Sequence, residues 1–170
     1  MYISFLHNMT PPSPSGGGHE PDLSLPQPQA DFIWRCAWLS VPSAIYAATA
    51  AATTHLAIVP ASVWATSLIY WRNPVRDSWR RTLDMAVVFS GVTYQTYYAF
   101  RHIGDTQAIA KYSALIGCSA ACYGFGHYFM GRAHIWSATY AHASIHLVAN
   151  VANVVLYDTI RRSAESCKEI

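Results

Sequence analysis

Four long stretches of the sequence contain no Asp, Glu, Lys or Arg, and they constrain the fold more than any other feature. They cover residues 36–71, 85–100, 112–131 and 133–157. Only 12% of the chain is charged, against roughly 25% in a typical soluble domain. A soluble protein distributes charges over its whole surface, whereas a bilayer is crossed by about 17 to 25 mostly apolar residues. The sequence therefore predicts an all-α, polytopic transmembrane helix bundle with the lipid bilayer as its partner.

The chain divides into three parts by composition. Residues 1–31 include a Pro/Gly/Ser-rich tract that cannot bury enough apolar surface to order itself, which predicts a disordered tail. Residues 32–160 form the predicted transmembrane domain, and residues 161–170 a short polar tail. Within the domain we expect five spans, at residues 33–51, 56–71, 83–100, 109–129 and 135–157. Because the first two spans share a single uncharged run, a four-span protein with a re-entrant segment is the alternative.

Five spans place the two ends of the chain on opposite sides of the membrane. The side of the N-terminal tail then carries four arginines between residues 72 and 81, and the positive-inside rule makes that side cytoplasmic. The pattern Asn8-Met9-Thr10 points the other way, because it is a glycosylation acceptor only in a lumenal tail. The net charge of +2 is small and its basic residues lie at span ends, so nucleic acid is not an expected partner.

Polar and ionisable residues at membrane depth are costly, which makes them the first candidates for function. With five spans, several of them fall in the leaflet on the side of the N-terminal tail: Ser67, Asp84, His127, His142 and His146. His142 and His146 are one helical turn apart on one face, where two imidazoles can bind one metal ion. A catalytic zinc site normally has three protein ligands. His127 matches the pair in depth, and His134 in the preceding loop is a second candidate.

Two blocks of the sequence resemble the hemolysin III and progestin/adiponectin receptor family. The first runs from Ser67-Leu68-Ile69-Tyr70-Trp71 to Trp79-Arg80-Arg81-Thr82-Leu83-Asp84, and the second is His142-Ala143-Ser144-Ile145-His146. The wider superfamily includes alkaline ceramidases. The resemblance implies a relative of seven-helix proteins in which three histidines hold zinc, with the Asp and the Ser supporting a metal-bound water. This chain departs from the family in two ways: it has five predicted spans, and Trp71 replaces the first histidine ligand with an indole, which cannot coordinate zinc.

The resemblance implies two alternative functions. The first is a small integral membrane protein that is non-catalytic or of reduced activity, in which the histidines and the following Asn150 and Asn153 only hydrogen-bond neighbouring helices. The second is a zinc-dependent hydrolase of lipid amides or esters, with a lipid substrate that enters from the bilayer. In the second, His142, His146 and His127 would hold Zn²⁺, while Asp84 and Ser67 would act on the water and the oxyanion.

Haem bound between His127 and His146 is a third interpretation. Both histidines lie at the same predicted depth on different spans.

Overall fold

The computed structural model describes residues 22–166, and its regular secondary structure there is helical, with one isolated β-bridge. The predicted all-α class is therefore confirmed. In chain order the elements are α1 (Gln27–Cys36), the 3₁₀ helix η2 (Ala37–Leu39), α2 (Ser40–Ala48), the 3₁₀ helix η3 (Thr54–Ala57), α3 (Ile58–Trp71), α4 (Trp79–His102), α5 (Thr106–Gly131) and α6 (Ile135–Ser166). These helices lie where the sequence predicts its five apolar segments.

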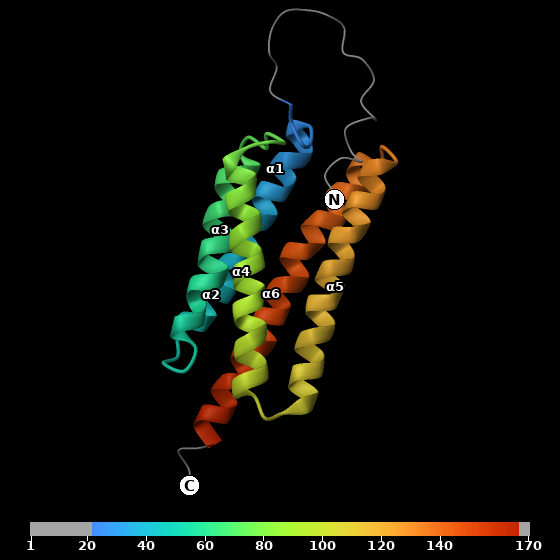
Figure 1. Cartoon of the computed structure of the whole chain (residues 1–170). Helices are drawn as coiled ribbons and strands as arrows, with labels where there is room; N and C mark the ends of the chain where they lie inside the picture. Colours follow the sequence, from blue (N-terminus) through green and yellow to red (C-terminus); the bar gives the residue numbers. More distant parts are fainter. Residues whose placement is uncertain (1–21, 167–170) are drawn as a thin grey trace, which may run out of the picture.

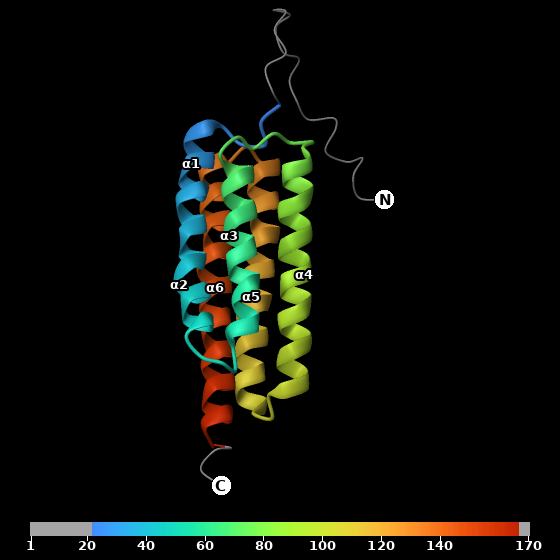
Figure 2. The same cartoon turned by 90° about the vertical axis from the view of Figure 1, so that its left-hand side faces the viewer.

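The helical segments alternate in direction along one elongated bundle (Figures 1 and 2). We call the end with the start of α1, the α3–α4 loop and the α5–α6 turn the upper end, and the opposite end the lower end. The rod formed by α1, η2 and α2 runs downward, α3 returns, α4 descends, α5 returns and α6 descends again. By length and apolarity, one helix of the described part, α6, is sufficient to cross a bilayer.

Proline accounts for the irregular middle of the first rod. The residues that join α1, η2 and α2 all keep right-handed helical backbone angles. Pro42 lacks an N–H, and its ring clashes with the carbonyl four residues earlier, which belongs to Trp38 in η2. The rod therefore tightens into a short 3₁₀ stretch at that point instead of breaking.

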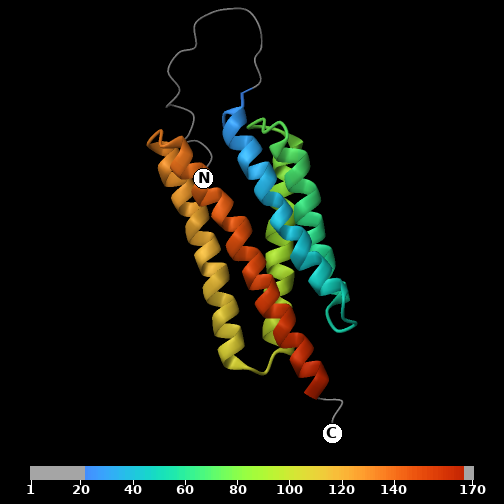
Figure 3. The ribbon, with the colours of Figure 1, turned by 180° about the vertical axis from the view of Figure 1, so that it is seen from behind.

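Helix α6 occupies the centre of the packing. It contacts α5 most extensively and also contacts α1 and α2, and Figure 3 shows it crossing between α5 on one side and the first rod on the other. Helix α4 packs mainly against α3 and touches α5 only weakly. One apolar core lies around Leu56, Tyr112 and Leu156, and a second lies around Ile33 and Trp71.

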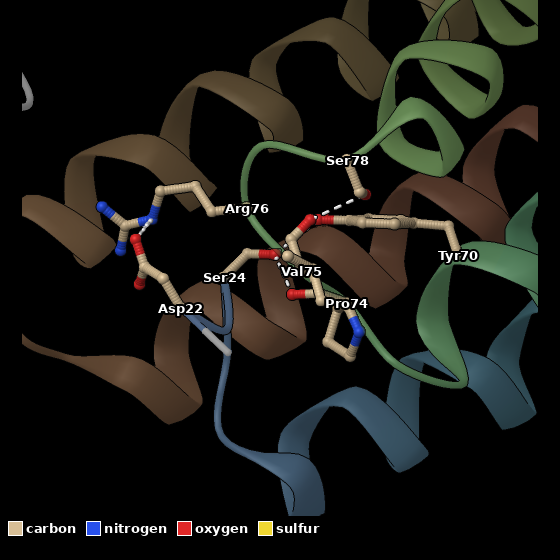
Figure 4. Close-up of polar contacts among 7 residues, drawn as sticks. All are labelled: Asp22, Ser24, Tyr70, Pro74, Val75, Arg76 and Ser78. Carbon is tan, nitrogen blue, oxygen red and sulfur yellow. Dashed lines mark hydrogen bonds and ion pairs between the residues drawn. The ribbon is translucent and has the colours of Figure 1, made fainter. Parts of the chain in front are cut away.

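The predicted domain boundaries differ from the structure at both ends. Composition assigns residues 22–31 to the disordered tail, yet Leu23 pairs with Val75 and α1 already begins at Gln27. Ser24 Oγ donates to the carbonyl of Pro74 at 2.7 Å, so this segment is held by the α3–α4 loop (Figure 4). At the other end, residues 161–166 continue α6 instead of starting a polar tail. Residues 1–21 and 167–170 lie outside the described part of the chain.

Candidate functional site

The first candidate group joins α3 to α4 through the carboxylate of Asp84. Asp84 is buried on α4, which begins after Ser78, whose hydroxyl accepts the backbone N–H of Arg81. Ser67 Oγ donates to Asp84 Oδ1 at 2.8 Å, and Thr66 Oγ1 lies 2.9 Å from the same oxygen. Ser67 and Asp84, which the sequence predicts to share one leaflet, are therefore in direct contact.

Thr66 is a partner of Asp84 that the sequence analysis missed. Its hydroxyl carries a single proton and also lies within reach of the carbonyls of Ser62 and Val63, at 3.1 and 3.3 Å. A threonine in a membrane helix often hydrogen-bonds its own preceding turn, so nothing in the sequence distinguishes Thr66 as a partner of another helix. Ser67 has Asp84 as its hydrogen-bond acceptor and is the more specific of the two donors.

The second candidate group is the histidine pair of α6. The ring centroids of His142 and His146 are 5.8 Å apart, so the two imidazoles share a helix face as their spacing predicts. His146 is 7% exposed, and its Nε2 atom has no hydrogen-bond partner among the described residues. Buried nitrogen atoms without partners are uncommon in native proteins and call for an explanation.

Trp71 lies directly against this pair. Its ring centroid is 4.8 Å from that of His142 in an edge-on arrangement, and also 4.8 Å from that of Tyr70. The indole is buried, and its Nε1 atom has no hydrogen-bond partner in the part of the chain that the structure describes. Because Trp71 and Ser67 are one turn apart on α3, this residue connects the histidine pair to the Asp84 group.

His127 and His134 are placed less favourably for a shared site. His127 is exposed on α5, and its ring packs on that of Tyr123 with centroids 4.5 Å apart. His134 is exposed just before α6, and its carbonyl accepts the N–H of Ala138 in the first turn. Within residues 22–166, no three His, Cys, Asp or Glu side chains are grouped so that they could hold one metal ion.

The two histidines of α6 continue into a polar stripe on the same helix, which comprises His142, His146, Asn150 and Asn153. The lower part of this stripe connects helices. Asn150 Nδ2 donates to Ser40 Oγ at 3.2 Å and to the carbonyl of His146 at 2.6 Å, and Asn150 Oδ1 accepts from Ser43. Asn153 is buried one turn further along. The stripe that the sequence predicts therefore faces protein, and its Asn150 section is occupied by hydrogen bonds to α2.

Tyr157 continues the same side of α6 and is another contact that the sequence analysis missed. Its side chain is fully buried, and its hydroxyl accepts from Gln95 of α4 and lies 3.5 Å from the carbonyl of Leu56. A polar atom on a buried tyrosine usually has such a partner. The tyrosine is one of 11 in the sequence, and without the fold nothing separates it from the exposed ones.

No family model, curated protein or solved structure is significantly similar to this chain. Its function is therefore inferred from the geometry of two groups near the upper end: a carboxylate held by hydroxyls between α3 and α4, and imidazoles beside an indole between α3 and α6.

Proposed function

We propose that this chain is an integral membrane protein that crosses the bilayer five times. The distribution of charge supports this proposal. In the described part of the chain, Asp84 is the one buried residue among Asp, Glu, Lys and Arg, and the remaining charged residues lie toward the two ends of the bundle. Charged residues near both ends and uncharged segments between them are the arrangement that a bilayer selects.

The outer faces of the helices support the same proposal. Phe89 on α4 is 75% exposed, Ile58 on α3 is 68% exposed and Phe125 on α5 is 58% exposed. Leaving a side chain of this size in water forgoes about 1.5 to 3 kcal/mol relative to burying it. Lipid tails around the bundle would cover these side chains.

Site-specific labelling tests the number of crossings. In a variant without native cysteines, single cysteines replace Asn73 and His134 at the upper end, and Ala51 and Gly104 at the lower end. A membrane-impermeant maleimide applied to sealed, oriented vesicles should label the two upper positions from one side and the two lower positions from the other. Labelling of an upper and a lower position from the same side contradicts five crossings.

Within this membrane protein we infer a non-catalytic role, as a shortened relative of the hemolysin III and progestin/adiponectin receptor superfamily. One observation carries the inference: Trp71, at the position where the resemblance places a histidine ligand, fills the space beside His142 with an indole. The Asn150 network gives the polar stripe a second use in joining helices. The buried polar groups then fix which helices are neighbours, as polar side chains do in other membrane proteins.

The second candidate is the zinc-dependent lipid hydrolase, and one observation favours it. The Nε2 atom of His146 is buried and has no hydrogen-bond partner within residues 22–166, as would be expected if a ligand normally occupied that position. The other residues do not fit a three-ligand set in this arrangement, because Trp71 lies against His142 and His127 is exposed on the neighbouring helix.

Counting zinc separates the two candidates. Zinc per chain is measured by elemental analysis in the native protein, in a His142→Ala/His146→Ala variant and in a Trp71→His variant. The non-catalytic role predicts far less than one zinc in the first two proteins, and an increase in the Trp71→His variant, where a third imidazole is placed beside His142. About one zinc in the native protein that is lost from the double variant would establish the second candidate, and a visible absorption band would instead indicate haem.

A further inference from the structure

A cavity of about 440 Å³ opens at the upper end, between α1 and the end of α3. It is lined by Asp31, Trp34, Arg35 and Arg72. The lining contains two guanidinium groups and one carboxylate, which gives it a formal charge of +1. Asp31 accepts a hydrogen bond from Gln27 Nε2 at 2.8 Å. The two arginines supply the excess positive charge of the cavity.

Among residues 22–166, three arginines of the upper end have guanidinium groups without an ion-pair, hydrogen-bond or cation–π partner, namely Arg35, Arg72 and Arg81, and of these Arg35 and Arg72 line the cavity. Arg76 pairs with Asp22 at 3.6 Å (Figure 4), Arg80 lies over the ring of Trp79, and Arg132 lies over the ring of Tyr128. The single carboxylate of Asp31 balances at most one of the two exposed cations that line this cavity, and the remaining positive charge is suited to an anionic ligand.

The backbone on both sides of the cavity is held in place. Gln27 Nε2 lies 3.4 Å from the carbonyl of Arg72, which connects the first turn of α1 to the end of α3. The segment before α1 is attached to the α3–α4 loop by two contacts (Figure 4). Ser24 donates to the carbonyl of Pro74, and Asp22 forms an ion pair with Arg76. Arg35 and Arg72 therefore project from backbone segments that are held together by hydrogen bonds. This reduces the entropic cost of placing both guanidinium groups on one ligand.

We propose that this cavity binds the phosphate group of an anionic lipid headgroup. Guanidinium groups form paired, charge-assisted hydrogen bonds with phosphate oxygens. Under the five-crossing proposal, the upper end of the bundle lies at the level of the headgroups, where basic cavities between helices bind such lipids. Trp34 has the amphipathic ring that is enriched at this depth. The inference depends on the proposed membrane crossing and is independent of whether zinc is bound.

Binding of short-chain lipids to the full-length protein in a neutral detergent tests this proposal. Dioctanoyl phosphatidate and dioctanoyl phosphatidylcholine are titrated separately, and inorganic phosphate is titrated alone as the soluble source of the same group. The variants are Arg35→Gln/Arg72→Gln, Arg35→Lys/Arg72→Lys, and a matched control, Arg101→Gln/Lys111→Gln, which removes two exposed charges from the lower end. Each arginine near a membrane surface contributes roughly 1 kcal/mol, so loss of both should weaken phosphatidate binding about thirtyfold.

The proposal requires saturable binding of phosphatidate that is much tighter than that of phosphatidylcholine, the thirtyfold loss in the Gln/Gln variant, partial retention in the Lys/Lys variant and native affinity in the control. An equal loss in the control variant would overturn it, because attraction would then follow net charge alone. Inorganic phosphate that binds as tightly as phosphatidate would overturn the assignment to a lipid. The substituted side chains are exposed, and a native elution profile in size-exclusion chromatography establishes that each variant is folded. If the vesicle labelling contradicts five crossings while phosphatidate binding persists, the membrane topology fails and the cavity assignment does not.

Discussion

The close approach of α3 and α4 at Gly91 gives the sharpest quantitative prediction. A Cβ atom at Gly91 would lie 2.7 Å from Val59 Cγ1, whereas nonbonded carbon atoms are usually about 3.5 to 4.0 Å apart. Val59 is β-branched and strongly prefers one χ1 rotamer in a helix, so the helices themselves must separate. Overpacking of this kind costs about 1 to 3 kcal/mol, and the better helix propensity of Ala returns up to about 1 kcal/mol. We expect Gly91→Ala to lower the free energy of unfolding by about 1 to 2 kcal/mol.

This effect should disappear when the clashing methyl group is removed. In a Val59→Ala background, Gly91→Ala should be neutral or slightly stabilising, so the double-mutant cycle yields a coupling energy of about 1 to 3 kcal/mol. Unfolding is followed by tryptophan fluorescence during an SDS titration in mixed micelles. Gly124→Ala is the matched control, because a Cβ at that helical glycine meets nothing within 4 Å. Equal stabilities of the Gly91→Ala and Gly124→Ala variants, or no relief from Val59→Ala, would refute the contact between α3 and α4.

Three further predictions concern the buried polar contacts and use the same unfolding assay. Ser67→Ala removes a donor from the buried carboxylate of Asp84 and should cost about 1 to 3 kcal/mol, whereas a change of less than about 0.5 kcal/mol, typical of surface sites, would argue against that contact. Asn150→Ala removes the hydrogen bonds to Ser40 and His146 and should cost about 1 to 2 kcal/mol; unchanged stability would mean that the stripe does not hold α6 to α2. Tyr157→Phe leaves the amide of Gln95 without its acceptor and should cost about 1 to 3 kcal/mol, an effect that Tyr97→Phe, on an exposed tyrosine of α4, should not reproduce.

Much of the helical framework can be predicted from charge and length. The four charge-free stretches overlap all five helical segments, because a backbone in apolar surroundings must form its hydrogen bonds internally and a helix does so locally. Depth along each helix follows from the constant rise of about 1.5 Å per residue. This is why Ser67 and Asp84, on different helices and 17 positions apart in sequence, could be expected to meet.

The end of the predicted disordered tail shows where composition is an insufficient guide. Residues 22–31 resemble the Pro-rich tract before them, and local sequence offers them no core of their own. They are nevertheless ordered by distant residues: Ser24 bonds Pro74 and Tyr70, and Leu25 is buried near Trp71. Order that depends on partners about 50 positions away is not visible in a local composition pattern.

Charge and length along the sequence are enough to predict the helical class, the positions of the apolar segments and the position of each polar residue along its helix. Only the tertiary structure decided which of those residues touch: that Trp71 packs on His142, that Thr66 joins Ser67 at Asp84, and that His127 is exposed on α5. The physical reason is that depth depends on the regular rise of one helix, whereas contact also depends on how helices rotate and approach. Rotation and approach are set by side-chain packing between helices. At Gly91, for example, the absence of a side chain leaves room for Val59 of α3.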